Sequence, residues 1–362
     1  MAVRMKDIAR KVGVSLMTVS KALRNHSDIA EETRRRVLKC ARDLHYEPNF
    51  TARSLADGRS YLVGLVVPDL MHSFFAEVAK GVESVLEPGG YQIVMSNSGE
   101  SAERELKQVR SLVSRKVDGL IIASAAKTFR ESPIELLQAQ AARYVLIDRT
   151  IPSAKFNYVG VKDEAVGICA TEHLIQQGCR HIAHIAGRAN STGTGRLRGY
   201  RRALAKHGFD ISPERIVREA YNESLGYAAM QTLLEVTPRI DGVFCYNDVV
   251  AAGAVSAILQ AGLNVPVDIA VIGVGNVHYS EQLRIPLSTV DQSSLQIGKS
   301  AAELLLNCIE SKKPLPLKRI FLPPQVIVRE SSLRSSPQVG PRHRDGATSL
   351  PQVNAALTEV MS

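Results

Sequence analysis

The feature that most constrains the fold is an alternation of short apolar runs with longer amphipathic segments between residues 61 and 330. The apolar runs lie at 62–67, 91–95, 120–123, 144–147, 181–186, 243–245 and 269–272. Helical spacing of apolar residues appears between them at 74–86, 103–114, 165–177, 197–207, 225–234 and 248–260. Strands alternating with helices predict parallel sheets that are covered by helices on both faces. Two such α/β blocks fit, with a seam near residue 160.

The first 46 residues have a different pattern and read as helix throughout. Apolar residues recur at helical spacing in 5–12, 16–23 and 31–44. Ala9, Gly13 and Val19 have the spacing of a helix-turn-helix: a small residue, a glycine for the left-handed turn, and a branched apolar anchor. The predicted fold class is therefore α followed by α/β.

Charge separates the same two regions. The chain has a net charge of +9, and residues 1–60 hold 13 Lys and Arg against 7 Asp and Glu. The remaining 302 residues are nearly balanced, with 32 basic and 29 acidic side chains. A basic module joined to a nearly neutral body indicates that the N-terminal part binds a polyanion.

The second helix of a helix-turn-helix enters the major groove of DNA, with its N-terminal residues near the bases. The residues expected to face DNA are Ser15, Leu16, Met17, Thr18, Ser20 and Lys21; of the polar residues, Thr18, Ser20, Asn25 and His26 are expected near phosphates. Leu16 and Met17 offer apolar contact to thymine methyl groups, and Lys21 can donate to guanine. Val14 and Val19 are expected to face the core.

Three motifs in order resemble the LacI/GalR family of repressors. The run Met5-Lys-Asp-Ile-Ala-Arg-Lys-Val-Gly-Val-Ser-Leu-Met-Thr-Val-Ser-Lys-Ala-Leu23 resembles that family's headpiece. The segment 46–55 resembles its hinge, and Val63-Gly-Leu-Val-Val-Pro-Asp69 resembles the first strand of its effector domain. The resemblance extends to Leu322-Pro-Pro-Gln-Val-Ile-Val-Arg-Glu-Ser331. One departure is Lys21, where the family commonly has Arg.

The resemblance implies a helix-turn-helix headpiece at 1–46, a hinge at 47–60 and a two-lobed, periplasmic-binding-protein-like effector and dimerisation domain at 61–331. Lobe 1 would span about 61–160 plus 291–321, and lobe 2 about 161–290 plus 322–331. The hinge would fold over the operator, with Asn49 as a cap, Arg53 on phosphate and Leu55 as an apolar wedge in the minor groove. Residues 332–362, rich in Ser, Pro, Gly, Arg and Gln, are expected to be disordered.

A ligand of such a domain would sit between the lobes at the carboxyl ends of strands. The candidate effector-binding residues are Phe74, Phe75, Ser124, Asp148, Thr192, Arg196, Tyr221, Asn247 and Asn276. An aromatic ring could stack on a polar ring while Arg, Asp and Asn exchange hydrogen bonds with it. Where the family typically has an aspartate, this chain has Gly275-Asn276, so the cleft loses a negative charge while Arg196 remains. That departure makes a ligand with a carboxylate or phosphate more plausible than the family resemblance alone implies. A neutral sugar stays open, because Asn276 could partly replace the aspartate toward hydroxyl groups.

Enzymatic motifs are weak in this sequence. Gly193-Thr-Gly195-Arg-Leu-Arg-Gly199 has the wrong spacing for a dinucleotide fingerprint, and no Walker A or G-x-S-x-G motif is present. His181 and His184 fall in a predicted strand, where positions three apart point to opposite faces. We therefore expect no enzyme activity, no metal site and no cofactor.

The leading interpretation is a sequence-specific transcriptional regulator, most simply a repressor, that binds a pseudo-palindromic DNA operator as a homodimer. Its effector would be a sugar, sugar acid or sugar phosphate. The alternatives are a DNA binder whose body only dimerises, and a cytosolic ligand-binding protein or enzyme with an incidental basic arm. No apolar run approaches the ~18 residues of a membrane span, and the N-terminus lacks the apolar core of a secretory signal. We expect a cytoplasmic protein without a membrane partner.

Overall fold

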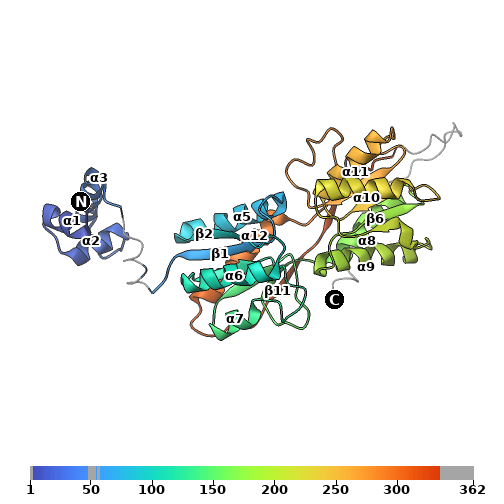
Figure 1. Cartoon of the computed structure of the whole chain (residues 1–362). Coiled ribbons are helices and arrows are strands. Elements are labelled where there is room, and N and C mark those ends of the chain that lie inside the picture. The colour runs from blue at the N-terminus through green and yellow to red at the C-terminus, as the bar shows by residue number, and fades with distance from the viewer. Residues whose placement is uncertain (1–2, 48–53, 55–57, 335–362) are drawn as a thin grey trace, which may run out of the picture. The chain divides into compact units, whose positions relative to one another are not determined.

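The computed structural model describes residues 3–47, 54 and 58–334, and the chain divides into two compact units, Met1–Ser60 and Tyr61–Ser362 (Figure 1). Each unit is considered by itself. Of the hinge predictions, Asn49, Arg53 and Leu55 lie outside the described residues, as does most of the C-terminal tail. No helix in the described ranges is long and apolar enough to cross a membrane.

The N-terminal unit contains three helices, α1 (Met5–Val12), α2 (Leu16–Leu23) and α3 (Glu31–Asp43). Gly13 ends α1 in the left-handed conformation with φ 74°, which a glycine adopts without strain. Ser15 caps α2, because its Oγ accepts a hydrogen bond of 3.0 Å from the backbone N–H of Thr18. The small core comprises Ile8, Val12, Val19, Ala22, Val37, Cys40 and Ala41, with Val14 packed against it. The predicted helix-turn-helix and its inward-facing valines are therefore confirmed.

The second unit is built on two six-stranded sheets. The first has the order β11-β5-β4-β3-β1-β2, and all of its strand pairs are parallel. Its strands are β1 (Leu62–Val67), β2 (Gln92–Asn97), β3 (Gly119–Ile122), β4 (Tyr144–Ile147), β5 (Tyr158–Val161) and β11 (Arg319–Leu322). This sheet is the centre of lobe 1, with α5 (Ser73–Leu86), α6 (Ala102–Ser114), α7 (Ile134–Ala139) and α12 (Ser294–Glu310) packed on it.

The second sheet has the order β12-β10-β9-β8-β6-β7 and is parallel except for the β10–β12 pair. Its strands are β6 (Ile182–Ile185), β7 (Ile216–Val217), β8 (Gly242–Cys245), β9 (Ala270–Val274), β10 (Ser288–Asp291) and β12 (Gln325–Ile327). In lobe 2, one face is covered by α8 (Asp163–Gln176) and α9 (Ser191–Lys206), the other by α10 (Glu223–Leu234) and α11 (Asp248–Gln260) (Figure 1).

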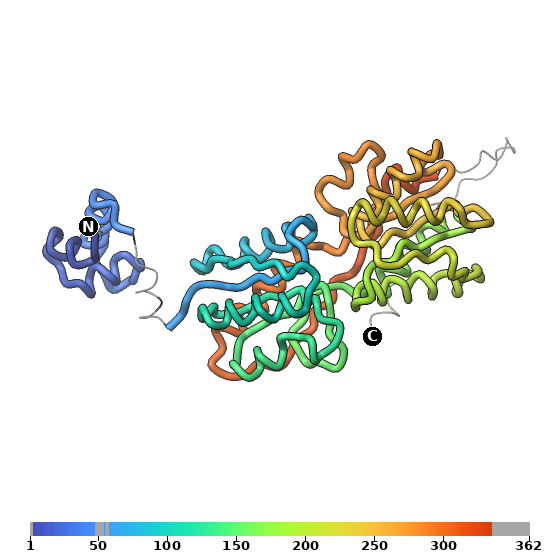
Figure 2. Tube along the Cα trace, viewed as in Figure 1, coloured from blue at the N-terminus to red at the C-terminus, as the bar shows by residue number. Residues whose placement is uncertain are grey.

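The chain passes between the two sheets three times: after β5, after β10 and after β11. The path of these crossings can be followed along the trace in Figure 2. Because three separate segments join the lobes, a relative movement of the lobes must bend all three together.

Glycines let neighbouring helices approach closely in three places. The pairs α5–α12, α8–α9 and α10–α11 each have a glycine on both helices where a Cβ would collide with backbone of the partner: Gly81 and Gly298, Gly167 and Gly199, Gly226 and Gly253. Of the glycines that resembled part of a dinucleotide fingerprint, Gly199 serves the contact between α8 and α9.

Every apolar run expected to form a strand lies on one, so the predicted α/β architecture is confirmed. Strands β5, β7, β10, β11 and β12 were not predicted, and neither were α7 and α12. Helix α9 begins at Ser191, six residues before the expected start, because its first turn is rich in Gly, Ser and Thr and lacks apolar periodicity.

Candidate functional site

The recognition helix α2 presents apolar side chains to solvent. Leu16 is 51% exposed and Met17 is 70% exposed, although both stand at the start of a helix whose other face is buried. Exposed apolar side chains at this position suit contact with thymine methyl groups. Ser15 and Thr18 are tied to each other by a 2.8 Å hydrogen bond between their hydroxyl groups.

Polar groups of the same unit surround α2. The Lys21 ammonium pairs with Asp28, a residue that the sequence did not single out as a partner. The backbone carbonyl of His26 accepts a 2.7 Å hydrogen bond from Arg34, and the side chains of Ser20, Asn25 and His26 are at least partly exposed. All of the predicted DNA-facing residues in the described range are therefore accessible, and their contacts with DNA stay a prediction.

The second site is a cavity of about 200 Å³ between the lobes. Lobe 1 contributes Pro68, Asp69, His72, Phe74, Phe75, Gly99, Glu100, Asp148 and Arg149, and lobe 2 contributes Arg188, Arg196, Tyr221, Tyr246, Asn247, Val274, Gly275 and Gln292. Most of these residues follow directly after a strand, because parallel strands bring their carboxyl ends to one edge of a sheet.

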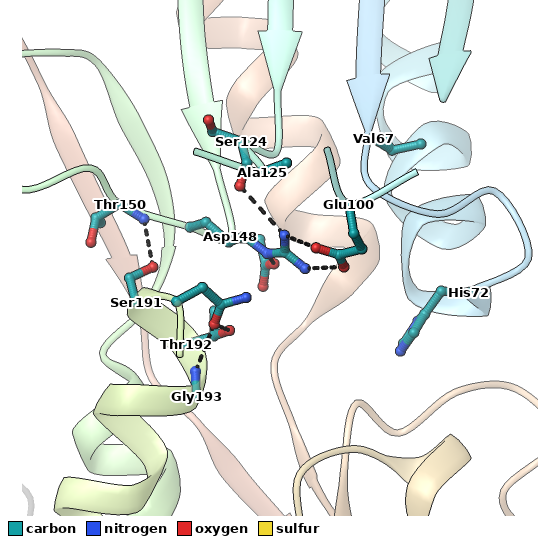
Figure 3. A network of polar contacts seen from close by, with 12 residues as sticks. Val67, His72, Glu100, Ser124, Ala125, Asp148, Thr150, Ser191, Thr192 and Gly193 are labelled. Carbon is teal, nitrogen blue, oxygen red and sulfur yellow. Dashed lines mark hydrogen bonds and ion pairs between the residues drawn. The ribbon is translucent and has the colours of Figure 1, made fainter. Parts of the chain in front are cut away.

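An arginine that the sequence reading missed organises the lobe 1 side. Arg149 forms two hydrogen bonds with Glu100, of 2.7 and 2.8 Å, and its Nε lies 3.6 Å from Asp148 (Figure 3). Burial acts to raise the pKa of Glu100, but the hydrogen bond and the charge of Arg149 outweigh it and hold this pKa below its ordinary value. Burial dominates for Asp148 and raises its pKa. Arg149 is therefore largely neutralised by Glu100.

Arg196, predicted from the sequence, lies buried in the lobe 2 side. Its Nε donates to Asp163 at 3.1 Å, and its Nη1 donates to the backbone carbonyl of Tyr246 at 2.7 Å. The guanidinium also lies 4.9 Å from the centre of the Tyr246 ring. Burial raises the pKa of Asp163 to about 7, against the opposing effect of Arg196. Arg196 thus lines the cavity with part of its donor capacity already used.

Arg188 is the cation of the cavity with the fewest protein partners. Its guanidinium stacks on Tyr221, with 4.0 Å between the guanidinium carbon and the ring centre. Among the described residues it has no ion-pair partner, and its buried Nε has no hydrogen-bond partner. The amide nitrogen of Gln292 is likewise buried without a partner. These donors are available to a ligand.

Direct contacts join the two lobes around the cavity. The Asn247 side-chain amide lies 3.0 Å from Nε2 of His72, and the Thr150 N–H donates to the Ser191 hydroxyl at 2.9 Å. Burial lowers the pKa of His72 to about 4, so the ring is neutral at pH 7. Asn247 also caps α11, since its Oδ1 accepts from the N–H of Val250. The lobes are therefore held by short polar contacts that a ligand can strengthen or replace.

Six of the nine predicted effector residues line the cavity: Phe74, Phe75, Asp148, Arg196, Tyr221 and Asn247. Three are not among its lining residues, because their side chains have partners elsewhere. Ser124 donates to Glu105 at 2.6 Å, and Thr192 bonds with Asn190 and Tyr246. Asn276 accepts from Arg329 at 2.8 Å and donates to Asp291.

The departure at Gly275-Asn276 has a structural consequence. Gly275 lines the cavity with φ 133°, a backbone conformation that side-chain-bearing residues rarely adopt. Asn276 faces Arg329 instead, and neither Asn276 nor Asp248, whose carboxylate lies behind Gly275, is among the residues that line the cavity. The wall at position 275 therefore carries no acidic side chain, as expected. Asn276 does not replace the missing aspartate, because its side chain does not line the cavity.

The histidines considered for a metal are structural. His184 is buried between Tyr200 and Phe244, with ring centres 5.2 and 4.3 Å away, and its Nδ1 donates to the Phe244 carbonyl. His181 contacts Arg215. Within the described part of the chain, no group of three or more His, Cys, Asp or Glu side chains is placed to hold a metal ion.

Comparisons with known proteins identify the family of both parts of the chain. The profile of bacterial regulatory proteins of the lacI family matches residues 4–49, and that of a periplasmic binding protein-like domain matches residues 171–332. The ribose operon repressor of Halalkalibacterium halodurans is 33% identical over 332 residues, which cover 90% of this chain and 96% of that protein. The chain belongs to the lacI family.

Other members of the family support this assignment. The HTH-type transcriptional repressor PurR of Aliivibrio fischeri is 34% identical over 91% of this chain and 98% of its own length. The solved complex of the transcriptional regulator CelR with cellobiose has a TM-score of 0.69 at 28% identity, covering 91% of this chain and all of that one. This lacI-family chain is a DNA-binding transcriptional regulator with a periplasmic-binding-protein-like effector domain, and it is not an enzyme.

Proposed function

We propose that this lacI-family protein is a transcriptional repressor whose operator affinity is set by a small anionic, hydroxyl-bearing ligand in the cavity between the lobes. A sugar acid or a sugar phosphate is the ligand class that fits best. The single observation that carries the proposal is Arg188, a cation stacked on Tyr221 in the cavity wall that forms no ion pair among the described residues, although its charge helps to lower the pKa of Glu100.

The balance of charge in the cavity supports an anion. Arg149 is matched by Glu100, and Arg196 is matched by Asp163 behind it. Arg188 forms no ion pair with a carboxylate among the described residues. Gly275 has no side chain, so no carboxylate at this position repels an anion. Asp69 and Asp148 are the other acids that line the cavity, and the raised pKa of Asp148 makes its charged form less favourable there. A guanidinium fork binds carboxylate or phosphate through two hydrogen bonds.

The neutral ligand class has its own support and defines the alternative. Asp69 and Asp148 also line the cavity and could accept hydrogen bonds from hydroxyl groups. The CelR structure named above holds a neutral sugar, cellobiose. A neutral sugar in the cavity would leave Arg188 to bond a hydroxyl or ring oxygen rather than an acid.

Control of DNA binding follows from the position of the cavity. A ligand that touches both lobes stabilises one arrangement of the lobes over another and shifts the population between them. We infer that the functional form is a homodimer on a pseudo-palindromic operator, with Leu16 and Met17 at the bases. Leu55 would act as a minor-groove wedge, as expected from the hinge motif.

A two-stage experiment tests the proposal. A thermal-shift screen of sugars, sugar acids and sugar phosphates identifies the ligand, since saturation at 100 times Kd adds about 2.7 kcal/mol of stability. An operator selected from a random duplex pool then reports affinity with and without that ligand. We expect an acidic ligand that changes operator affinity. A screen in which only neutral sugars bind would contradict the anionic class, and a binding ligand with no effect on DNA would contradict the regulation.

A further inference from the structure

A second hollow lies in lobe 2, beside the cavity between the lobes but with its own lining. It has a volume of about 320 Å³ and is bounded by α9 and by the segment after the edge strand β7. Its lining residues are Ala186, Gly187, Arg188, Ala189, Gly193, Thr194, Leu197, Arg198, Arg201, Arg218 and Glu219. We call it the α9 groove. Arg188 is the residue that it shares with the effector cavity.

The α9 groove is strongly basic. Four arginines line it, Arg188, Arg198, Arg201 and Arg218, and Glu219 is its single lining acid. The stretch 180–220 as a whole contains nine Lys and Arg against three Asp and Glu. Gathering like charges around one hollow costs the folded state free energy unless an anion compensates them.

The neighbouring carboxylates compensate only part of this charge. Arg198 pairs with Glu164 at 3.5 Å, with 63% of the arginine side chain exposed. Among the described residues, neither Arg201 nor Arg218 has an ion-pair partner. The positive field of Arg201 and Arg218 reaches inward, where both contribute to the lowered pKa of the buried His184 after burial itself.

The walls of the groove are preformed. Leu197 is 7% exposed in its floor and belongs to the core between α8, α9 and the sheet. Gly193 stands where a Cβ would collide with the Arg188 carbonyl, so the loop before α9 packs directly on the first turn of the helix. Arg198 and Arg201 therefore project from a rigid helix, three residues apart on one face.

We propose that the α9 groove is a second ligand site, which binds a small phosphate-bearing anion. Guanidinium groups bind phosphate oxygens through paired hydrogen bonds, and four of them around one open groove suit a ligand with more than one phosphate charge. The site is distinct from the effector cavity and does not depend on the proposed function. Arg188 is shared by the two sites, so it is unsuitable as the test residue.

The test uses inorganic pyrophosphate as the probe and the full-length protein, titrated by calorimetry at constant ionic strength. The variant Arg201→Gln/Arg218→Gln removes two charges from the groove on exposed side chains. The matched control Arg110→Gln/Arg115→Gln removes two exposed charges that do not line it. A third protein, Gln292→Glu, places a carboxylate in the effector cavity without changing side-chain size.

We expect pyrophosphate to bind the wild type, with at least tenfold weaker binding to the groove variant and less than twofold change in the other two proteins. Three results overturn the proposal. The wild type fails to bind pyrophosphate, or the control double variant weakens binding as much as the groove variant does. The third overturning result is that Gln292→Glu weakens pyrophosphate binding tenfold while the groove variant does not. That result would place the anion in the effector cavity. That last result would support the anionic ligand proposed above, so failures of the two proposals are distinguishable.

Discussion

The helix-turn-helix and the effector cavity achieve function by opposite physical means. In the first, apolar side chains are exposed: Met17 is 70% exposed on a helix whose opposite face packs on a small core. In the second, charged side chains are buried: Arg149 and Arg196 are 6% and 3% exposed. Exposure of Met17 costs little folding free energy, whereas a buried arginine requires partners. Substitutions should therefore separate stability from function in the N-terminal unit but couple them in the cavity.

The sharpest way to break this comparison is to remove a buried charge. Arg149→Met leaves Glu100 and Asp148 buried without their cation, and we expect a loss of about 3–5 kcal/mol in the free energy of unfolding. Urea denaturation of the full chain, followed by circular dichroism, measures it. The double variant Arg149→Met/Glu100→Gln removes the pair together and should recover a large part of the loss. A single variant within about 1 kcal/mol of wild type would show that the pair is not electrostatically coupled.

Acid should affect the effector domain through its buried histidines. Burial lowers the pKa values of His72 and His173 to about 4 and that of His184 to about 3, from an ordinary 6.5. A depressed pKa means that the unfolded chain binds the proton first. Stability contributed by these neutral rings is thus present above pH 6.5 and is lost as the pH falls from 6.5 toward 4.

A substitution at His184 tests how much this residue contributes to the pH dependence of the unfolding free energy. His184→Phe keeps an aromatic ring between Tyr200 and Phe244 but cannot titrate. We expect the slope of unfolding free energy against pH between 6.5 and 4 to fall by one proton, about 1.4 kcal/mol per pH unit. The measurement is urea denaturation at several pH values. An unchanged slope would mean that His184 is not the titrating group.

The exposed residues of α2 test the other half of the comparison, that function and stability are separable in the N-terminal unit. Leu16→Ala/Met17→Ala should change the unfolding free energy by no more than about 0.5 kcal/mol, because both side chains are largely in solvent. Operator affinity should fall by about 1–3 kcal/mol, through lost contact with base edges. Thermal denaturation and fluorescence anisotropy on a selected operator give the two numbers. Equal operator affinity in variant and wild type would refute the role of these side chains.

The smallest expected effect concerns the ligand class. Gln292→Glu places a carboxylate in the cavity at a buried position, where the wild-type amide nitrogen has no hydrogen-bond partner. An acidic ligand should bind at least tenfold more weakly, a change of about 1.4 kcal/mol. Gln292→Met is the matched uncharged control. A ligand that binds Gln292→Glu and Gln292→Met equally well would contradict an acid near this wall.

The two regions also differ in how much of their structure could be predicted from the sequence. The N-terminal motif was predictable in detail, because Ala9, Gly13 and Val19 act through contacts less than three helical turns apart. In the cavity, Arg196 and Tyr221 were found through a family resemblance, whereas Glu100, Arg149 and Arg188 were missed. Glu100 and Arg149 are 49 residues apart and meet only because the strands that precede them belong to one sheet. No local sequence pattern therefore predicts their ion pair.

Asn276 illustrates the opposite error. Its position after a predicted strand placed it in the cavity by analogy, but its side chain faces Arg329, 53 residues later in the chain. Arg329 follows β12, which pairs with β10 after the chain has returned from lobe 1, and apolar periodicity does not predict this return. The direction of the Asn276 side chain therefore depends on Arg329, which follows the last strand of the sheet.

The central claim is that a ligand in the cavity controls binding of DNA. The most direct test is fluorescence anisotropy of a selected operator with full-length protein, comparing the ratio of operator affinities with and without the ligand found by thermal shift. Tyr221→Ala removes the ring on which Arg188 stacks at 4.0 Å. We predict that ligand changes operator affinity at least tenfold in the wild type, and that the ratio approaches one in Tyr221→Ala. An equal ratio in the two proteins would contradict the claim.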